Sequence, residues 1–74
     1  MTLEEAIKHL AYKDYDDGDI NYIIQAISIN ELEVIRHPLW EQAKVAKYAL
    51  EADTYMKVID TINNRIEYHK KNIL

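Results

Sequence analysis

The chain has 74 residues, of which 13 are acidic and nine are Lys or Arg, and its formal net charge is −4. A chain of this length forms one domain with a thin core, because it buries only about 60% of the surface that the unfolded chain exposes. It has no cysteine, which excludes disulfides and thiolate metal sites, and no apolar run approaches the roughly 18 residues of a membrane span. We therefore expect one soluble, cytoplasmic domain over residues 1–74.

The charge is unevenly distributed along the chain. Residues 1–37 contain eight acidic and three basic residues, whereas residues 38–74 contain five acidic and six basic residues. Phosphate binding needs clustered Lys and Arg, so the acidic first half argues against direct binding of nucleic acid. It favours a partner protein with a basic surface, or a protein that imitates the charge of a nucleic acid.

The first predicted helix begins at Thr2, because Thr2-Leu3-Glu4-Glu5 has the sequence of a capping box. Leu3, Ile7 and Leu10 keep the spacing of one buried helix face, and this pattern ends at Asp14. A turn over residues 14–19 follows, in which Gly18 and the aspartates favour a chain reversal and cap the next helix. The spacing does not fit a calcium-binding EF-hand loop, because ligand positions would fall on Lys13 and Ile24.

Residues 20–35 are dense in apolar and β-branched side chains. This composition fits a helix that is buried on more than one side, and a short β-hairpin is an alternative. Ser28-Ile29-Asn30-Glu31 is a second capping-box sequence, so the segment can also form two short helices with a bend near Ser28.

His37-Pro38 predicts a helix boundary, because Pro suits the first position of a helix and disfavours helical geometry in the residue before it. Nothing breaks the helix from there to about residue 72. The predicted fold is therefore an all-α bundle of two short, acidic N-terminal helices over residues 1–37 and one long helix over about 38–72.

The long helix carries a heptad pattern. Its a positions are Val45, Ala52, Ile59, Ile66 and Ile73, and its d positions are Tyr48, Tyr55, Ile62 and His69. About four heptads of this kind favour a parallel coiled-coil homodimer. The residues that we assign to dimerisation are Tyr48, Ala52, Tyr55, Ile59, Ile62, Ile66 and Ile73.

The same pattern also fits the internal core of a helical bundle. Leu39, Ala43, Ala46 and Leu50 form a second apolar face, roughly opposite to that of Ile59 and Ile66. A break near residues 52–54 would let both faces fold onto one core.

The sequence offers no catalytic or metal-binding motif. The three histidines are far apart, the single glycine excludes a glycine-rich phosphate loop, and Ser28 is the only serine. A helix-turn-helix over residues 26–39 would present Glu31 and Glu33 to phosphates. We therefore expect no enzymatic activity, no cofactor, no metal and no direct contact with nucleic acid or membrane.

Six tyrosines and no phenylalanine indicate a contact surface rather than a purely dry core, because tyrosine combines a large apolar ring with a polar tip. The residues that we assign to partner binding are Tyr12, Asp14, Tyr15, Asp16, Asp17, Asp19 and Tyr22. The alternative is that these tyrosines only cover the core and the aspartates only cap a helix.

The expected function is a non-enzymatic, protein-binding regulator or inhibitor of a larger protein. The Ile, Lys, Asn and Tyr bias is typical of a phage or an AT-rich bacterium, and an anti-defence protein acting in a bacterial host cell is of this kind. The alternatives are a structural subunit that oligomerises into a larger assembly, and an acidic nucleic-acid mimic that blocks a basic cleft.

Overall fold

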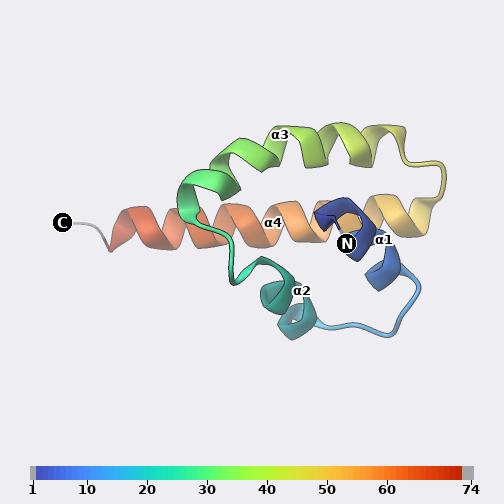
Figure 1. Ribbon diagram of the computed structural model, residues 1–74, viewed down its shortest axis with the longest axis horizontal. Helices are drawn as coiled ribbons and strands as arrows, with labels where there is room; N and C mark the ends of the chain where they lie inside the picture. Colours follow the sequence, from blue (N-terminus) through green and yellow to red (C-terminus); the bar gives the residue numbers. More distant parts are fainter. Residues whose placement is uncertain (1, 73–74) are drawn as a thin grey trace.

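The computed structural model describes residues 2–72, which form four helices. The helices are α1 (Leu3–Ala11), α2 (Asp17–Ile24), α3 (Ile29–Val45) and α4 (Ala49–Lys71), shown in Figure 1. The described residues contain no strand, so the predicted all-α class is confirmed and the hairpin alternative for residues 20–35 is wrong. The number of helices is four rather than the predicted three.

Helices α1 and α3 begin at the capping sequences that start at Thr2 and Ser28, whereas α2 begins at Asp17, inside the predicted turn over residues 14–19. Thr2 Oγ1 accepts a hydrogen bond from the Glu5 amide at 3.1 Å, and Ser28 Oγ accepts one from the Glu31 amide at 3.2 Å. Asp16 and Asp19 form a complete capping box, in which each carboxylate accepts from the other residue's amide. These bonds satisfy amides that a helix start leaves free. The predicted division near Ser28 is therefore confirmed.

Pro38 does not begin a helix, which corrects the predicted boundary. It lies in the interior of α3, where it cannot donate to the carbonyl of Val34. Both residues are exposed, so that carbonyl can bind water instead. Leu32 and Leu39, before and after the proline, are buried against the rest of the protein and keep this helix continuous.

The predicted long helix over residues 38–72 is also wrong, because the chain turns between α3 and α4. Ala46 and Tyr48 have extended backbone geometry there, and the side chain of Tyr48 forms no hydrogen bond that caps α4. The two helices lie side by side and antiparallel (Figure 1). The alternative in which two apolar faces fold onto one core is thus correct, but the break precedes residues 52–54.

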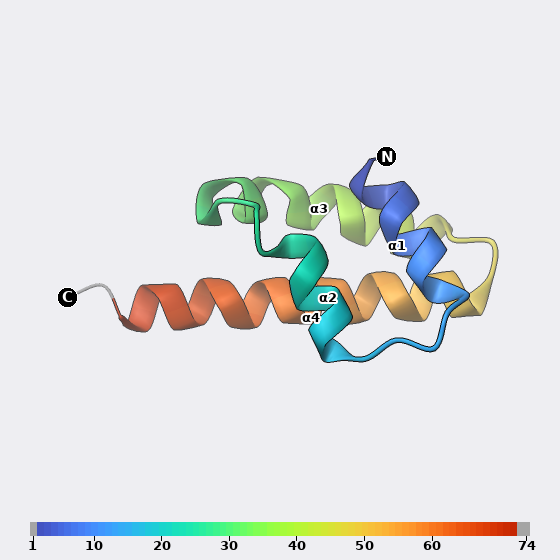
Figure 2. The same ribbon diagram turned by 60° about the horizontal axis from the view of Figure 1, so that its bottom comes forward.

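Helix α4 is the element against which the other three pack. Figure 2 shows α2 crossing the middle of α4, with α1 across its first half and α3 alongside. The buried apolar side chains come from all four helices: Ile7, Leu10, Ala11, Ile20, Ile24, Leu32, Leu39, Ala43, Tyr55, Val58, Ile59, Ile62 and Ile66. None of the helices within residues 2–72 has an apolar stretch long enough to cross a lipid bilayer.

The heptad residues in the middle of α4 belong to this core. Tyr55, Ile59, Ile62 and Ile66 are buried within the single chain, so the folded chain does not present them as a dimer seam. Tyr48 is exposed, Ala52 is half-buried, and Ile73 lies outside the described residues. The internal-core alternative accounts for the pattern, and homodimerisation stays a prediction that would need another surface.

Candidate protein-interaction surface

The loop between α1 and α2 is held against α4 by Tyr15. The Tyr15 hydroxyl lies 3.1 Å from Thr54 Oγ1, and the Lys57 Nζ lies 5.3 Å from the centre of the Tyr15 ring. Tyr15 is half-buried and Thr54 is fully buried. We call residues 12–16, between α1 and α2, the acidic loop. These contacts hold it over the first half of α4.

The four aspartates within residues 14–19 are all exposed, but they have different roles. Asp16 and Asp19 are engaged in the capping box of α2. Neither Asp14 nor Asp17 forms an ion pair with another residue in the range 2–72. The alternative that the aspartates only cap a helix therefore accounts for Asp16 and Asp19, whereas Asp14 and Asp17 have charges that a partner can reach.

The two other tyrosines of the predicted surface lie on different helices. Tyr12, at the end of α1, is 60% exposed and donates a hydrogen bond to the Glu51 carboxylate. This bond to a negatively charged acceptor raises the pKa of Tyr12 to about 12. Tyr22, on α2, is 74% exposed. Neither ring covers the core, so both are available for contact with another molecule.

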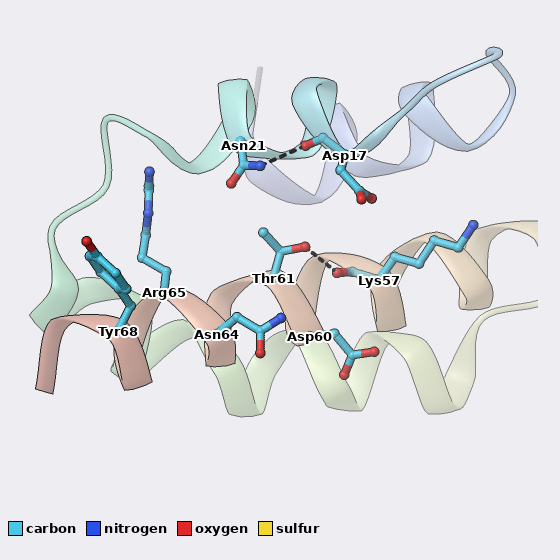
Figure 3. Close-up of a pocket in the computed structure, with 8 residues that line it drawn as sticks. All are labelled: Asp17, Asn21, Lys57, Asp60, Thr61, Asn64, Arg65 and Tyr68. Carbon is cyan, nitrogen blue, oxygen red and sulfur yellow. Dashed lines mark hydrogen bonds between the residues drawn. The ribbon is translucent and has the colours of Figure 1, made fainter. Parts of the chain in front are cut away.

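A groove runs between α2 and α4, next to the acidic loop. Its first part has a volume of about 570 Å³ and opens to solvent. Helix α2 contributes Asp17 and Asn21 to its wall, and α4 contributes the remaining side chains (Figure 3). The residues that line it are Asp17, Asn21, Lys57, Asp60, Thr61, Asn64, Arg65 and Tyr68.

The groove continues past Arg65 and Tyr68 into a second hollow of about 390 Å³, which these two residues also line. The residues around this hollow are Gln25, Ile27, Ser28, Ile29, Arg65, Tyr68, His69 and Asn72. We call both parts together the α2–α4 groove. It contains amide, charged, aromatic and apolar groups on one continuous surface.

Arg65 joins the two parts of the groove. It extends from α4 toward the segment that follows α2 (Figure 3), and its Nη1 donates to the carbonyl of Ile24 at 3.2 Å. The same carbonyl also accepts from the Ile27 amide at 3.0 Å, so Arg65 is its second donor, and the bond holds the guanidinium against the end of α2. A guanidinium has five N–H donors, so most of its hydrogen-bonding capacity remains for a bound molecule.

Sequence reasoning missed the α4 side of this surface. Lys57, Thr61 and Tyr68 recur at the spacing of one helix face, as do Asp60 and Asn64. This periodicity of polar residues was the available signal. The periodicity does not reveal that α2 packs beside this polar face. The apolar heptad on the neighbouring face predicted a second copy of the chain as the partner of α4 instead.

No group of three His, Asp or Glu side chains within residues 2–72 is arranged to hold a metal ion. The groove also lies open to water, whereas ligand and reaction sites usually enclose most of the bound molecule. Its shallow shape and mixed polarity suit contact with a segment of another macromolecule.

Comparisons of the chain with models of protein families, with curated proteins and with solved structures found no match.

Proposed function

We propose that the protein is a non-enzymatic, protein-binding module that regulates or inhibits a larger protein, encoded by a phage or a bacterium. The binding surface is the acidic loop together with the α2–α4 groove. One observation carries the proposal: Asp17 belongs both to the predicted acidic turn and to the wall of the groove. The exposed charge of the loop therefore continues into a hollow that can receive part of a partner.

The chemistry of this surface supports contact with a protein. Asp14, Asp17 and Asp60 are exposed and form no ion pair within the described chain, so a basic partner would meet unneutralised carboxylates. Opposite charge on the partner speeds the encounter of two proteins. Tyr22 and Tyr68 are more than 70% exposed nearby on α2 and α4, and exposed tyrosine favours protein interfaces.

The test is affinity capture from a bacterial lysate with native protein and two charge-reversal variants. The first is Asp14→Lys with Asp17→Lys, which leaves the Asp16–Asp19 capping box intact. The matched control is Asp53→Lys with Glu67→Lys, two exposed positions on α4 that line no part of the groove. Both variants change the charge equally, and circular dichroism checks that both remain folded.

We expect the native chain and the control variant to retain one captured protein. The Asp14 and Asp17 variant should bind this protein about tenfold more weakly, which corresponds to about 1.4 kcal/mol of binding energy. Equal capture by both variants contradicts the proposed surface. Repeating the capture at higher ionic strength tests the nucleic-acid mimic, because binding that depends on charge alone then falls steeply.

A further inference from the structure

We propose that the α2–α4 groove binds an extended peptide segment of the partner, with one basic and one acidic side chain about four residues apart, given roughly 3.3 Å per extended residue. The basic side chain lies at the end lined by Asp17 and Asp60, and the acidic side chain lies against Arg65 and His69. This inference rests on the proposed protein-binding function and adds the chemistry of the segment that is bound.

The end of the groove next to the acidic loop carries two carboxylates, Asp17 from α2 and Asp60 from α4 (Figure 3). Lys57 is the cation at this end, and its Nζ is placed over the Tyr15 ring rather than paired with either aspartate. Arg65 also lines the first part of the groove, but it lies at the junction with the second hollow, so the end near the loop has two carboxylates and one cation. Asp14 in the adjacent loop adds to the negative charge. Arg or Lys complements this charge.

The other end of the groove has the opposite charge. Its lining contains Arg65 and His69 and, among the described residues, no acidic side chain. Because the bond from Arg65 to Ile24 already fixes the guanidinium, a carboxylate meets a donor that needs little reorganisation. Tyr68, which is 72% exposed, lines the same hollow and can donate its hydroxyl to a carboxylate there.

The middle of the groove suits the backbone of an extended chain. Asn21 uses its amide nitrogen to donate to the Asp17 carbonyl at 3.0 Å, which leaves the side-chain oxygen free to accept. Asn64 on the facing helix lines the same part of the groove. Side-chain amides supply both a donor and an acceptor, and the backbone of an extended peptide needs both.

The length of the groove sets the spacing of the two charges. Asp60 and His69 are nine positions apart on α4. At a rise of 1.5 Å per residue this is about 13 Å along the helix, and an extended chain covers about 3.3 Å per residue. The basic and acidic side chains of the bound segment are therefore about four residues apart.

The experiment is selection of phage-displayed random dodecapeptides on the immobilised native protein. Enriched peptides are then synthesised and titrated into isotope-labelled protein by NMR. We expect the enriched sequences to share a basic and an acidic residue about four positions apart, because the spacing follows from the helix rise. The amide shifts should concentrate in α2 and in the second half of α4.

Two sets of changes test the charges. Asp17→Asn with Asp60→Asn should weaken peptide binding about tenfold, a loss of about 1.4 kcal/mol, while the control Asp53→Asn with Glu67→Gln should not. Exchanging the acidic residue of the peptide for lysine should weaken binding to the native protein to a similar extent. This second change requires no variant at Arg65, whose replacement also removes the bond to α2.

Failure of this inference is distinct from failure of the proposed function. The groove inference is overturned if no peptide is enriched, if the enriched peptides lack the charge pair, or if their shifts lie outside the groove. The protein-binding proposal still holds if capture depends on Asp14 and Asp17. If peptides bind the groove through Asp17 and Asp60 but capture does not depend on Asp14 and Asp17, the proposed partner surface is contradicted, whereas the peptide preference of the groove stands.

Discussion

The hydroxyl groups of Tyr15 and Thr54 lie 3.1 Å apart and join the acidic loop to the buried side of α4. Thr54 Oγ1 also lies 3.0 Å from the carbonyl of Leu50, which can only accept. Because threonine has a single hydroxyl proton, Thr54 donates it to Leu50, and Tyr15 donates to Thr54. The direction of both bonds follows, and each polar atom of the pair is satisfied.

Thr54→Val should lower the free energy of unfolding by about 1 kcal/mol, because it removes the acceptor of the Tyr15 hydroxyl without changing the volume of the core. Urea denaturation followed by circular dichroism measures this. Thr61→Val is the control, since the Thr61 hydroxyl donates only to the carbonyl of Lys57. Combining Thr54→Val with Tyr15→Phe should cost less than the sum of the two changes, and full additivity would contradict the bond.

Ile66→Ala should destabilise the protein by about 2–5 kcal/mol, because Ile66 is buried in the core of the single chain. Val45→Ala, at another a position of the heptad, should change stability by less than about 0.5 kcal/mol, since Val45 is 71% exposed. Denaturation and light scattering over a dilution series distinguish whether Ile66 belongs to the core of one chain or to a dimer interface. A native dimer that Ile66→Ala converts into an equally stable monomer is the result that contradicts the core assignment.

Pro38→Ala should stabilise the protein, by up to about 3 kcal/mol, because alanine restores the amide that the interior of α3 lacks and has the higher helix propensity. The midpoint of thermal unfolding measures the effect. Pro at the first position of a helix is favourable, so a neutral or destabilising result would instead support a helix that begins at Pro38.

Glu51→Gln should lower the pKa of Tyr12 from about 12 toward its ordinary value, because the carboxylate that accepts from the phenol is lost. The protonated phenol is the form that the fold stabilises. The contribution of the Tyr12–Glu51 bond to the free energy of unfolding is complete below the ordinary tyrosine pKa of about 10. It disappears as the pH rises through the pKa of Tyr12 in the folded protein. The ultraviolet difference spectrum between each protein and its Tyr12→Phe variant reports the titration of Tyr12. An unchanged titration after Glu51→Gln would show that another group raises this pKa.

The helix starts were predictable from the sequence, whereas the principal chain reversal was not. Thr2, Asp16 and Ser28 have side chains that bond directly to nearby amides, so local sequence suffices. Residues 46–48 contain neither glycine nor proline, and no side chain caps the helix that follows. Burial of Leu39 and Ala43 against α4 selects this turn, and that information lies in contacts distant along the chain.

Only the part of the candidate site that is local in sequence was predictable. Asp14, Tyr15 and Asp17 are close in sequence and stay together in space. Asp60 and Arg65 meet this region only because α2 crosses α4, and heptad periodicity cannot indicate which neighbour lies beside a polar face. Pro38 led to a wrong prediction of a helix boundary. The packing of α3 on both sides of this residue overrides the preference of proline for the first position of a helix.

The position of α4 has a consequence for how the chain folds during synthesis. The Tyr55 hydroxyl donates to the carbonyl of Glu4 at 3.4 Å, although 51 positions separate the two residues. Helices α1 and α2 leave the ribosome before the surface on which they pack has been made, and contacts this distant in sequence slow folding. Until α4 has been made and has left the ribosome, side chains such as Ile7 and Ile20 lack the surface that buries them in the folded chain.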